Sequence, residues 1–205
     1  MCLRKQHNSF VQLQERLLII SRFLQLIGFL KMHTNIEIKS RVKDVEQLKE
    51  KVHLESGART DLLIQEDIFF NVPQGRLKLR KTQGNKSKLI FYERKDTENA
   101  KESKFDISVI EDPMSLEIVL SRALGIKGIV KKRRELYIAG QTRIHIDDVE
   151  GLGNFMELEV MMKEDQEKLE GVKIAEDFMK KFNIQKSDLI AGAYIDLLHE
   201  KNSSN

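Results

Sequence analysis

The chain has 205 residues, of which 40% are hydrophobic and 33% charged, and its 35 Lys and Arg against 32 Asp and Glu give a formal net charge of +3. A chain of this length and composition can bury a sizeable core as a globular domain without covalent staples. The single cysteine, Cys2, excludes an internal disulfide framework and a thiolate zinc cluster, and favours a reducing, cytoplasmic location.

The first 31 residues differ from the rest in charge, because they carry +4 while residues 32–205 carry −1. Residues 17–30 are mostly apolar, but Arg22 and Gln25 interrupt them and the stretch is too short to span a bilayer. We interpret residues 1–31 as a dispensable extension, with a mitochondrial presequence or a helix for a membrane surface or a partner as alternatives. Residues 32–205 form the main domain, for which the balanced charge argues against broad nucleic-acid binding and no membrane partner is expected.

The pattern from residue 32 onward is one of alternating strands. Residues 35–42 alternate polar and apolar side chains and are expected to form a strand. A helix follows, with Asp44 as its cap and Gly57 as its stop. Further strands are predicted over residues 64–72, 76–80 and 88–94, separated by turns at residues 73–75 and 84–85.

The second half of the domain continues in the same way. Residues 104–110 read as a strand, and Asp112 and Pro113 open a helix that ends before Gly125. Alternating strands are expected over residues 129–138, 141–149 and 155–161, and helices over residues 164–182 and 187–199. About eight antiparallel strands with helices between and after them predict an α+β fold.

The polar sides of these strands are almost entirely charged. A sheet wetted on one face explains each strand alone, but Arg suits phosphate recognition and grouped carboxylates suit a hard cation. If the sheet closes with this face inward, its charged lumen would hold an elongated polyanion. The residues at these alternate positions are Asn35, Glu37, Lys39, Arg41, Arg76, Lys78, Arg80, Lys132, Arg134, Arg143, His145, Asp147, Glu157 and Glu159.

Three of these segments resemble the CYTH superfamily of triphosphate tunnel enzymes, which includes class IV adenylyl cyclases and thiamine triphosphatases. The resemblance rests on residues 36–39, on Lys132 with Arg134, and on residues 141–159, and it extends over about residues 33–200. It implies a closed eight-stranded antiparallel β-barrel with flanking helices, and a small-molecule triphosphate as substrate.

The resemblance also implies roles for individual residues. Asn35 departs from the family pattern, because an amide stands where a glutamate is usual, which weakens one metal position. By the resemblance, Mg²⁺ or Mn²⁺ would be held by Glu37, Asp147, Glu157 and Glu159, and the triphosphate by Lys39, Lys78, Arg80, Lys132 and Arg134. Arg41, Arg76, Arg94 and Arg143 join the triphosphate-binding set through their places on the strands.

The expected reaction is hydrolysis by a water molecule that attacks the terminal phosphorus, with Lys39, beside Glu37, as a hypothetical base. Cyclisation of ATP to cyclic AMP and pyrophosphate is the alternative, and hydrolysis is preferred because it makes fewer geometric demands. A non-catalytic polyphosphate sensor or RNA-end binder is a third reading, in which Phe69, Phe70, Phe91 and Tyr92 would stack on bases, although core packing explains these rings better. A homodimer is compatible with the sequence, but no feature requires one.

Overall fold

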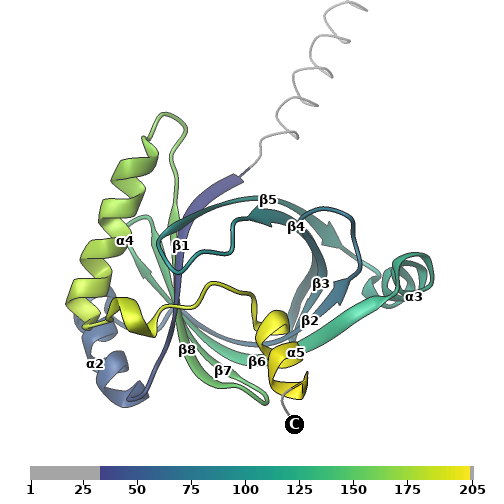
Figure 1. Cartoon of the computed structure of the whole chain (residues 1–205), viewed down its shortest axis with the longest axis horizontal. Coiled ribbons are helices and arrows are strands. Elements are labelled where there is room, and N and C mark those ends of the chain that lie inside the picture. Colours follow the sequence, from purple (N-terminus) through teal and green to yellow (C-terminus); the bar gives the residue numbers. More distant parts are fainter. Residues whose placement is uncertain (1–32, 204–205) are drawn as a thin grey trace, which may run out of the picture. The chain divides into compact units, whose positions relative to one another are not determined.

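The computed structural model describes residues 33–203, and the predicted extension over residues 1–31 lies outside them. Eight strands close into one barrel whose neighbouring strands are all antiparallel, in the order β1-β5-β4-β3-β2-β6-β7-β8 (Figure 1). This confirms the predicted closed eight-stranded barrel. The strands are β1 (His33–Arg41), β2 (Asp61–Phe70), β3 (Arg76–Thr82), β4 (Asn85–Arg94), β5 (Lys101–Ile110), β6 (Ile126–Ala139), β7 (Thr142–Val149) and β8 (Gly153–Met161).

The alternation along each strand sets which side chains face the lumen. Glu37 and Lys39 of β1 line a cavity inside the barrel, whereas their neighbours Ile36 and Ile38 are buried in an apolar cluster on the outside. The same rule holds on β8, where Glu157 and Glu159 point inward and Leu158 joins the outer cluster. The barrel is therefore inverted relative to an ordinary small barrel, with its charges inside and its apolar core between strands and helices.

Helices cover the apolar outer faces of the barrel. Helix α4 (Lys168–Phe182) packs on β1 and β8, and helix α2 (Val45–Ser56) packs beside α4 on β6 and β7. Helix α3 (Pro113–Leu124) lies at the far side of the barrel against β2 and β3 (Figure 1). The predicted cap of α2 is present, because the Asp44 carboxylate accepts a hydrogen bond from the Gln47 backbone N–H at 2.9 Å. Helix α4 begins at Lys168, later than the predicted residue 164.

The prediction of one helix over residues 187–199 is wrong. A 3-10 turn at Lys186–Asp188 precedes an extended segment, and helix α5 runs over Tyr194–Ser203. The backbone of this extended segment forms hydrogen bonds with β1 instead of the internal hydrogen bonds of a helix. The Ile190 backbone N–H donates to the Lys39 carbonyl oxygen at 2.9 Å. The segment leads into α5, which packs against β6. Ile195 of α5 lies directly over Gly128 of β6, where any side chain would clash with it. None of the helices in residues 33–203 has the length and apolar character of a bilayer span.

Candidate active site

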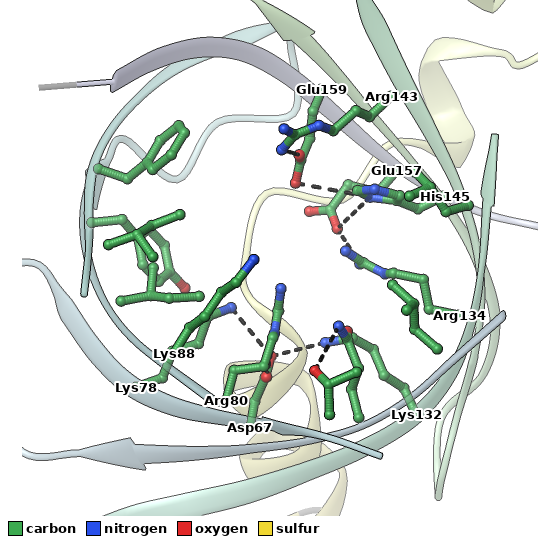
Figure 2. Close-up of a pocket in the computed structure, with 18 of the residues that line it drawn as sticks. Asp67, Lys78, Arg80, Lys88, Lys132, Arg134, Arg143, His145, Glu157 and Glu159 are labelled. Atoms are coloured by element: carbon green, nitrogen blue, oxygen red, sulfur yellow. Dashed lines mark hydrogen bonds and ion pairs between the residues drawn. The ribbon is translucent and has the colours of Figure 1, made fainter. Parts of the chain in front are cut away.

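The barrel encloses a cavity of about 720 Å³ whose walls are strongly charged (Figure 2). Nine Lys and Arg line it against five Asp and Glu, so the lining carries four net positive charges when all are ionised. Such a lumen attracts a polyanion. The cations are Lys39, Lys78, Arg80, Lys86, Lys88, Arg94, Lys132, Arg134 and Arg143, and the acids are Glu37, Asp61, Asp67, Glu157 and Glu159.

One carboxylate, Asp67 of β2, gathers three cations at the floor of the cavity (Figure 2). It accepts hydrogen bonds from Arg80 at 2.6 and 2.7 Å, from Lys132 at 2.8 Å and from Lys78 at 3.2 Å. Burial alone would raise the pKa of Asp67, but these three cations hold it well below its usual range. With all four groups ionised, the cluster carries two positive charges in excess, which an anion can neutralise.

The two lysines of this cluster have lowered pKa values. Burial, aided by neighbouring guanidinium groups, lowers the pKa of Lys132 to about 7 and that of Lys78 to about 8, although Asp67 opposes both shifts. Part of their charge is thus absent near neutral pH until an anion arrives. A phosphate beside these ammonium groups favours their charged forms and raises both pKa values again.

This arrangement makes anion binding depend on pH. Between pH 6 and 8 the free protein loses the Lys132 charge, so we expect its affinity for tripolyphosphate, measured with chelator present, to fall relative to that of Lys132→Arg. If binding raises the pKa of Lys132 by one unit, the relative loss is roughly fivefold. Calorimetric titration of both proteins measures it, and the comparison cancels the ligand's own titration. Parallel pH profiles for the two proteins would show that Lys132 does not face the bound anion.

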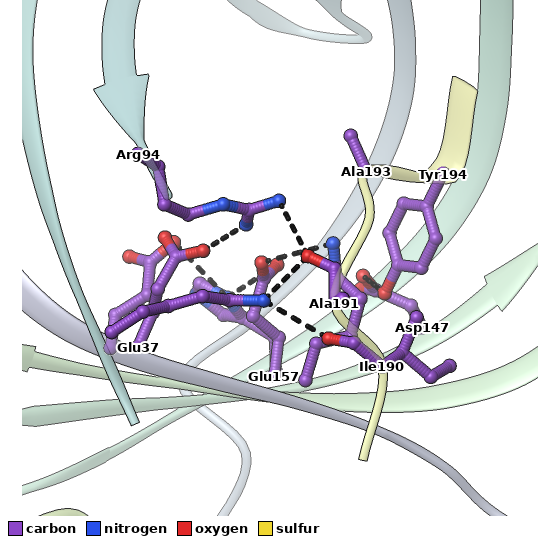
Figure 3. Close-up of polar contacts among 12 residues, drawn as sticks. Glu37, Arg94, Asp147, Glu157, Ile190, Ala191, Ala193 and Tyr194 are labelled. Atoms are coloured by element: carbon purple, nitrogen blue, oxygen red, sulfur yellow. Dashed lines mark hydrogen bonds and ion pairs between the residues drawn. The ribbon is translucent and has the colours of Figure 1, made fainter. Parts of the chain in front are cut away.

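A second network centres on Arg134 of β6. Its guanidinium donates two hydrogen bonds to Asp147 and one to Glu157, all at 2.6 Å, and all three side chains are buried. The Tyr194 hydroxyl donates to Asp147 at 2.8 Å (Figure 3). Asp147 is fully buried and is not among the residues that line the cavity. It thus holds Arg134 and α5 in place, and the structure does not bring it into the predicted metal-binding group.

A third network joins β1, β4 and the segment before α5 (Figure 3). Glu37 forms an ion pair with Arg94, whose guanidinium also donates to the Ala191 carbonyl oxygen. Lys101 of β5 donates to the carbonyl oxygens of Ile190 and Ala191 at 3.0 and 2.7 Å. Both predicted catalytic residues lie beside the lumen, but Glu37 is engaged by Arg94. Lys39 lies 3.6 Å from Glu157 and 4.1 Å above the Tyr194 ring, and its role as a base stays a prediction.

His145, Glu157 and Glu159 form the group best suited to a divalent cation, since their ligand atoms lie within 4.8 Å of one another. His145 Nδ1 lies 4.0 Å from Glu157 and 3.8 Å from Glu159, and this buried atom has no hydrogen-bond partner in the described structure. Burial and Arg134 lower the pKa of His145 well below its usual value, which leaves a neutral imidazole able to ligate. Burial and repulsion by Glu157 raise the pKa of Glu159. A cation beside Glu159 would offset both the lost hydration and the repulsion between the two carboxylates. Two carboxylates and one imidazole nitrogen fit Mg²⁺ or Mn²⁺ in their donor types.

Two predicted triphosphate ligands lie outside the cavity. Arg41 is exposed and lines a separate depression with Gly151 and Leu152. Arg76 pairs with Asp96 at 2.5 Å and with Asp196 at 2.8 Å. Both arginines follow the inward alternation but stand near strand ends, where the chain has already left the lumen. The structure places Arg41 at the barrel rim and Arg76 at the attachment of α5, and triphosphate binding by either arginine stays a prediction.

The structure also adds residues to the predicted set. Asn35 lines the cavity, and its buried side-chain oxygen has no hydrogen-bond partner in the described part of the chain. Lys88 of β4 points into the cavity and has no carboxylate partner among residues 33–203 (Figure 2). Its place in the alternation of residues 88–94 is a usable signal, as is the parity of Asp67, which sets its carboxylate on the opposite face of β2 from the adjacent Glu66. Lys101 gave no comparable signal, because its partners are backbone carbonyls.

An inverted, charged eight-stranded barrel of this kind has the fold of the triphosphate tunnel proteins. The sequence profile of the CYTH domain matches residues 33–194, and the chain belongs to this family. It is 28% identical over 172 residues to MJ0240 of Methanocaldococcus jannaschii, a protein whose name suggests an adenylate cyclase, and the match covers 79% of this chain and 97% of that protein.

Solved structures agree with this assignment. The PH1012 protein of Pyrococcus horikoshii OT3 superposes with a TM-score of 0.72 at 28% identity, over 80% of this chain and 98% of that one. HpAC1 of Hippeastrum, which is described as having a dominant triphosphatase activity, superposes with a TM-score of 0.56 at 19% identity, over 78% of this chain and 91% of that one. At that identity the likeness to HpAC1 concerns the fold.

Proposed function

We propose that the cavity binds the triphosphate group of a small molecule and that the protein hydrolyses it with a divalent cation, Mg²⁺ or Mn²⁺. The observation that carries this proposal is the separation of charge inside one lumen. A cation-rich floor around Asp67 lies across from the His145, Glu157 and Glu159 group (Figure 2). Metal-assisted phosphoryl transfer needs both parts, one to hold phosphate oxygens and the other to hold the cation.

In this mechanism Arg80, Lys78 and Lys132 hold the phosphate chain, with Lys88 as a further ammonium that no carboxylate of residues 33–203 engages. Arg134, fixed by Asp147 and Glu157, presents an oriented positive charge to the oxygens on which negative charge builds up. A divalent cation held by Glu157, Glu159 and His145 would supply electrophilic assistance to those oxygens. Water attacks the terminal phosphorus, the bond from that phosphorus to the bridging oxygen breaks, and orthophosphate and a diphosphate leave.

Hydrolysis is favoured over cyclisation because it needs only a water molecule next to the terminal phosphate. Cyclisation of ATP requires the ribose 3′-oxygen to fold back onto the α-phosphorus, which demands additional contacts with the sugar. The name of the relative MJ0240 supports the cyclase as the second candidate. The two candidates use the same charged walls and differ in their products.

Product analysis tests the proposal. The purified chain is incubated with ATP, thiamine triphosphate and tripolyphosphate in turn, with Mg²⁺, with Mn²⁺ and with chelator. We expect orthophosphate from at least one substrate, only when a metal is present. Cyclic AMP with pyrophosphate would assign the cyclase reaction instead. Absence of any product, combined with triphosphate binding that persists in chelator, would assign a binding module and overturn the enzyme proposal.

A further inference from the structure

One wall of the cavity is apolar. Ile90 of β4 and Phe105, Ile107 and Val109 of β5 all line the lumen. The strand register makes them neighbours, because Ile90 pairs with Ile107, and Phe105 and Val109 lie on either side along the same face of β5. These four residues form a continuous apolar strip, here called the β5 strip, with Tyr92 beside Phe105.

The β5 strip lies across the lumen from the wall that carries Arg134 and His145. In the closed ring of eight strands, β5 stands four places from β6 and β4 stands four places from β7, so each pair lies across the lumen. Arg134 belongs to β6 and His145 to β7. Figure 2 shows apolar side chains along the wall opposite these two residues. A molecule in the lumen therefore touches charge on one side and hydrocarbon on the other.

The strip is uncovered at Ile107 and Val109, whereas Ile90 is buried and Phe105 is partly buried. Ile107 is 43% exposed and Val109 is 51% exposed, although both line the interior of the barrel. Their alternation partners Asp106 and Ser108 take the outer face of β5. Apolar surface left wet inside a cavity is unfavourable, and a ligand with an apolar face removes it from water. An inorganic triphosphate has no such face, and a cavity of about 720 Å³ has the size typical of sites for organic ligands.

Charge at the edge of the strip fixes the direction of such a ligand. Lys88 pairs with Val109 across β4 and β5, and Arg80 pairs with Lys88 across β3 and β4. The anion-binding floor thus borders the apolar strip without a gap in the sheet. A phosphate chain held at Arg80 and Lys88 places its organic substituent against Ile107 and Ile90.

We propose that the β5 strip binds the organic group that carries the triphosphate, a flat ring system such as a nucleobase or a thiamine-like heterocycle. This rests on the proposed function and narrows its substrate to organic triphosphates in preference to inorganic tripolyphosphate. The ring lies against Ile107 and Ile90, and the phosphates extend across the lumen towards Arg134. Ile107 is then a residue that determines substrate specificity without contact with the reacting phosphorus.

The test compares two substrates in three proteins, with kcat/KM as the readout. Ile107→Asn makes the strip polar at its centre, and Ile129→Asn is a matched control, because Ile129 is also 43% exposed and lies outside the cavity lining. We expect wild type to prefer ATP or thiamine triphosphate over tripolyphosphate. Ile107→Asn should lower kcat/KM for the organic substrate about tenfold and leave tripolyphosphate turnover unchanged. Ile129→Asn should change neither value.

The outcomes separate this inference from the proposed function. Wild-type preference for tripolyphosphate, or an equal loss for both substrates in Ile107→Asn, overturns the β5 strip as a ring-binding site while hydrolysis stands. If wild type turns over no triphosphate, the proposed function fails, and calorimetry then decides the inference. In that case the affinity of ATP must fall in Ile107→Asn while that of tripolyphosphate does not, and equal affinities in both proteins overturn it.

Discussion

Replacement of Arg134 by methionine is expected to destabilise the fold by about 3–5 kcal/mol, because it leaves Asp147 and Glu157 buried without their shared cation. The Asp147 side chain is fully buried and does not line the cavity, so water does not replace the two hydrogen bonds that its carboxylate loses. The hydroxyl of Tyr194 would lose an oriented acceptor, which loosens α5 as well. Chemical denaturation of both proteins at neutral pH measures the difference.

The neighbouring residue provides the control for this prediction. Arg133 faces outward, its side chain is 50% exposed, and its contact with Glu135 is 3.6 Å. Arg133→Met should therefore cost under about 1 kcal/mol. In Arg134→Met the two orphaned carboxylates have raised pKa values, so its deficit should shrink as the pH falls and they take up protons. Equal stabilities of the two variants would mean that the buried network does not support the barrel.

Replacement of Glu159 by glutamine is expected to abolish activity without loss of stability, in contrast to the destabilising replacement of Arg134. The negative charge of Glu159 is only weakly neutralised by neighbouring cations. Arg143 lies 3.8 Å away, and burial together with Arg134 keeps the His145 imidazole neutral. Burial and repulsion by Glu157 raise its pKa, so its charged form opposes folding as the pH rises through the carboxylate range. Glutamine removes that opposition and also removes a metal ligand.

We therefore expect Glu159→Gln to lower metal-dependent turnover at least roughly 100-fold, and to unfold at a denaturant concentration equal to or above that of wild type. Weaker Mn²⁺ binding, followed by electron paramagnetic resonance, should accompany the loss. Glu66→Gln on the outer face of β2 is the control, since Glu66 pairs with Lys81 and does not line the cavity. Full activity in Glu159→Gln would remove this carboxylate from the cation site.

Much of the fold followed from the period of two along each strand. Because successive side chains of a strand face opposite sides, the charged positions of β1, β3, β6, β7 and β8 had to share one face. The structure places Lys39, Lys78, Arg80, Lys132 and Arg134 in one lumen, as that rule requires. The aromatic residues also alternate between the outer face and the lumen. Phe70 packs against α3 on the outside, whereas Phe69 and Tyr92 line the cavity, where the Lys78 ammonium lies near both rings.

Two features of the site could not be predicted from the sequence: how far along the barrel axis each side chain lies, and which acidic group pairs with which basic group. Alternation gives the side of a strand but not the distance along the barrel, so Arg41 and Arg76 shared the inward parity while lying outside the lumen. Alternation also does not say which carboxylate pairs with which cation. The family resemblance implies a metal-ligand role for Asp147, and in the structure its carboxylate accepts hydrogen bonds from Arg134 and Tyr194. Helix α5 starts later than its periodicity indicated, because backbone pairing with β1 keeps the preceding segment extended.

In the proposed reaction, water attacks the terminal phosphorus of a triphosphate held in this lumen. Turnover of ATP in ¹⁸O-labelled water with Mg²⁺ or Mn²⁺, followed by mass analysis of the products, tests it directly. We expect one ¹⁸O atom in the released orthophosphate and none in the diphosphate. Unlabelled pyrophosphate with cyclic AMP, or label in AMP, would place the attack at the α-phosphorus and rule out hydrolysis at the terminal phosphorus.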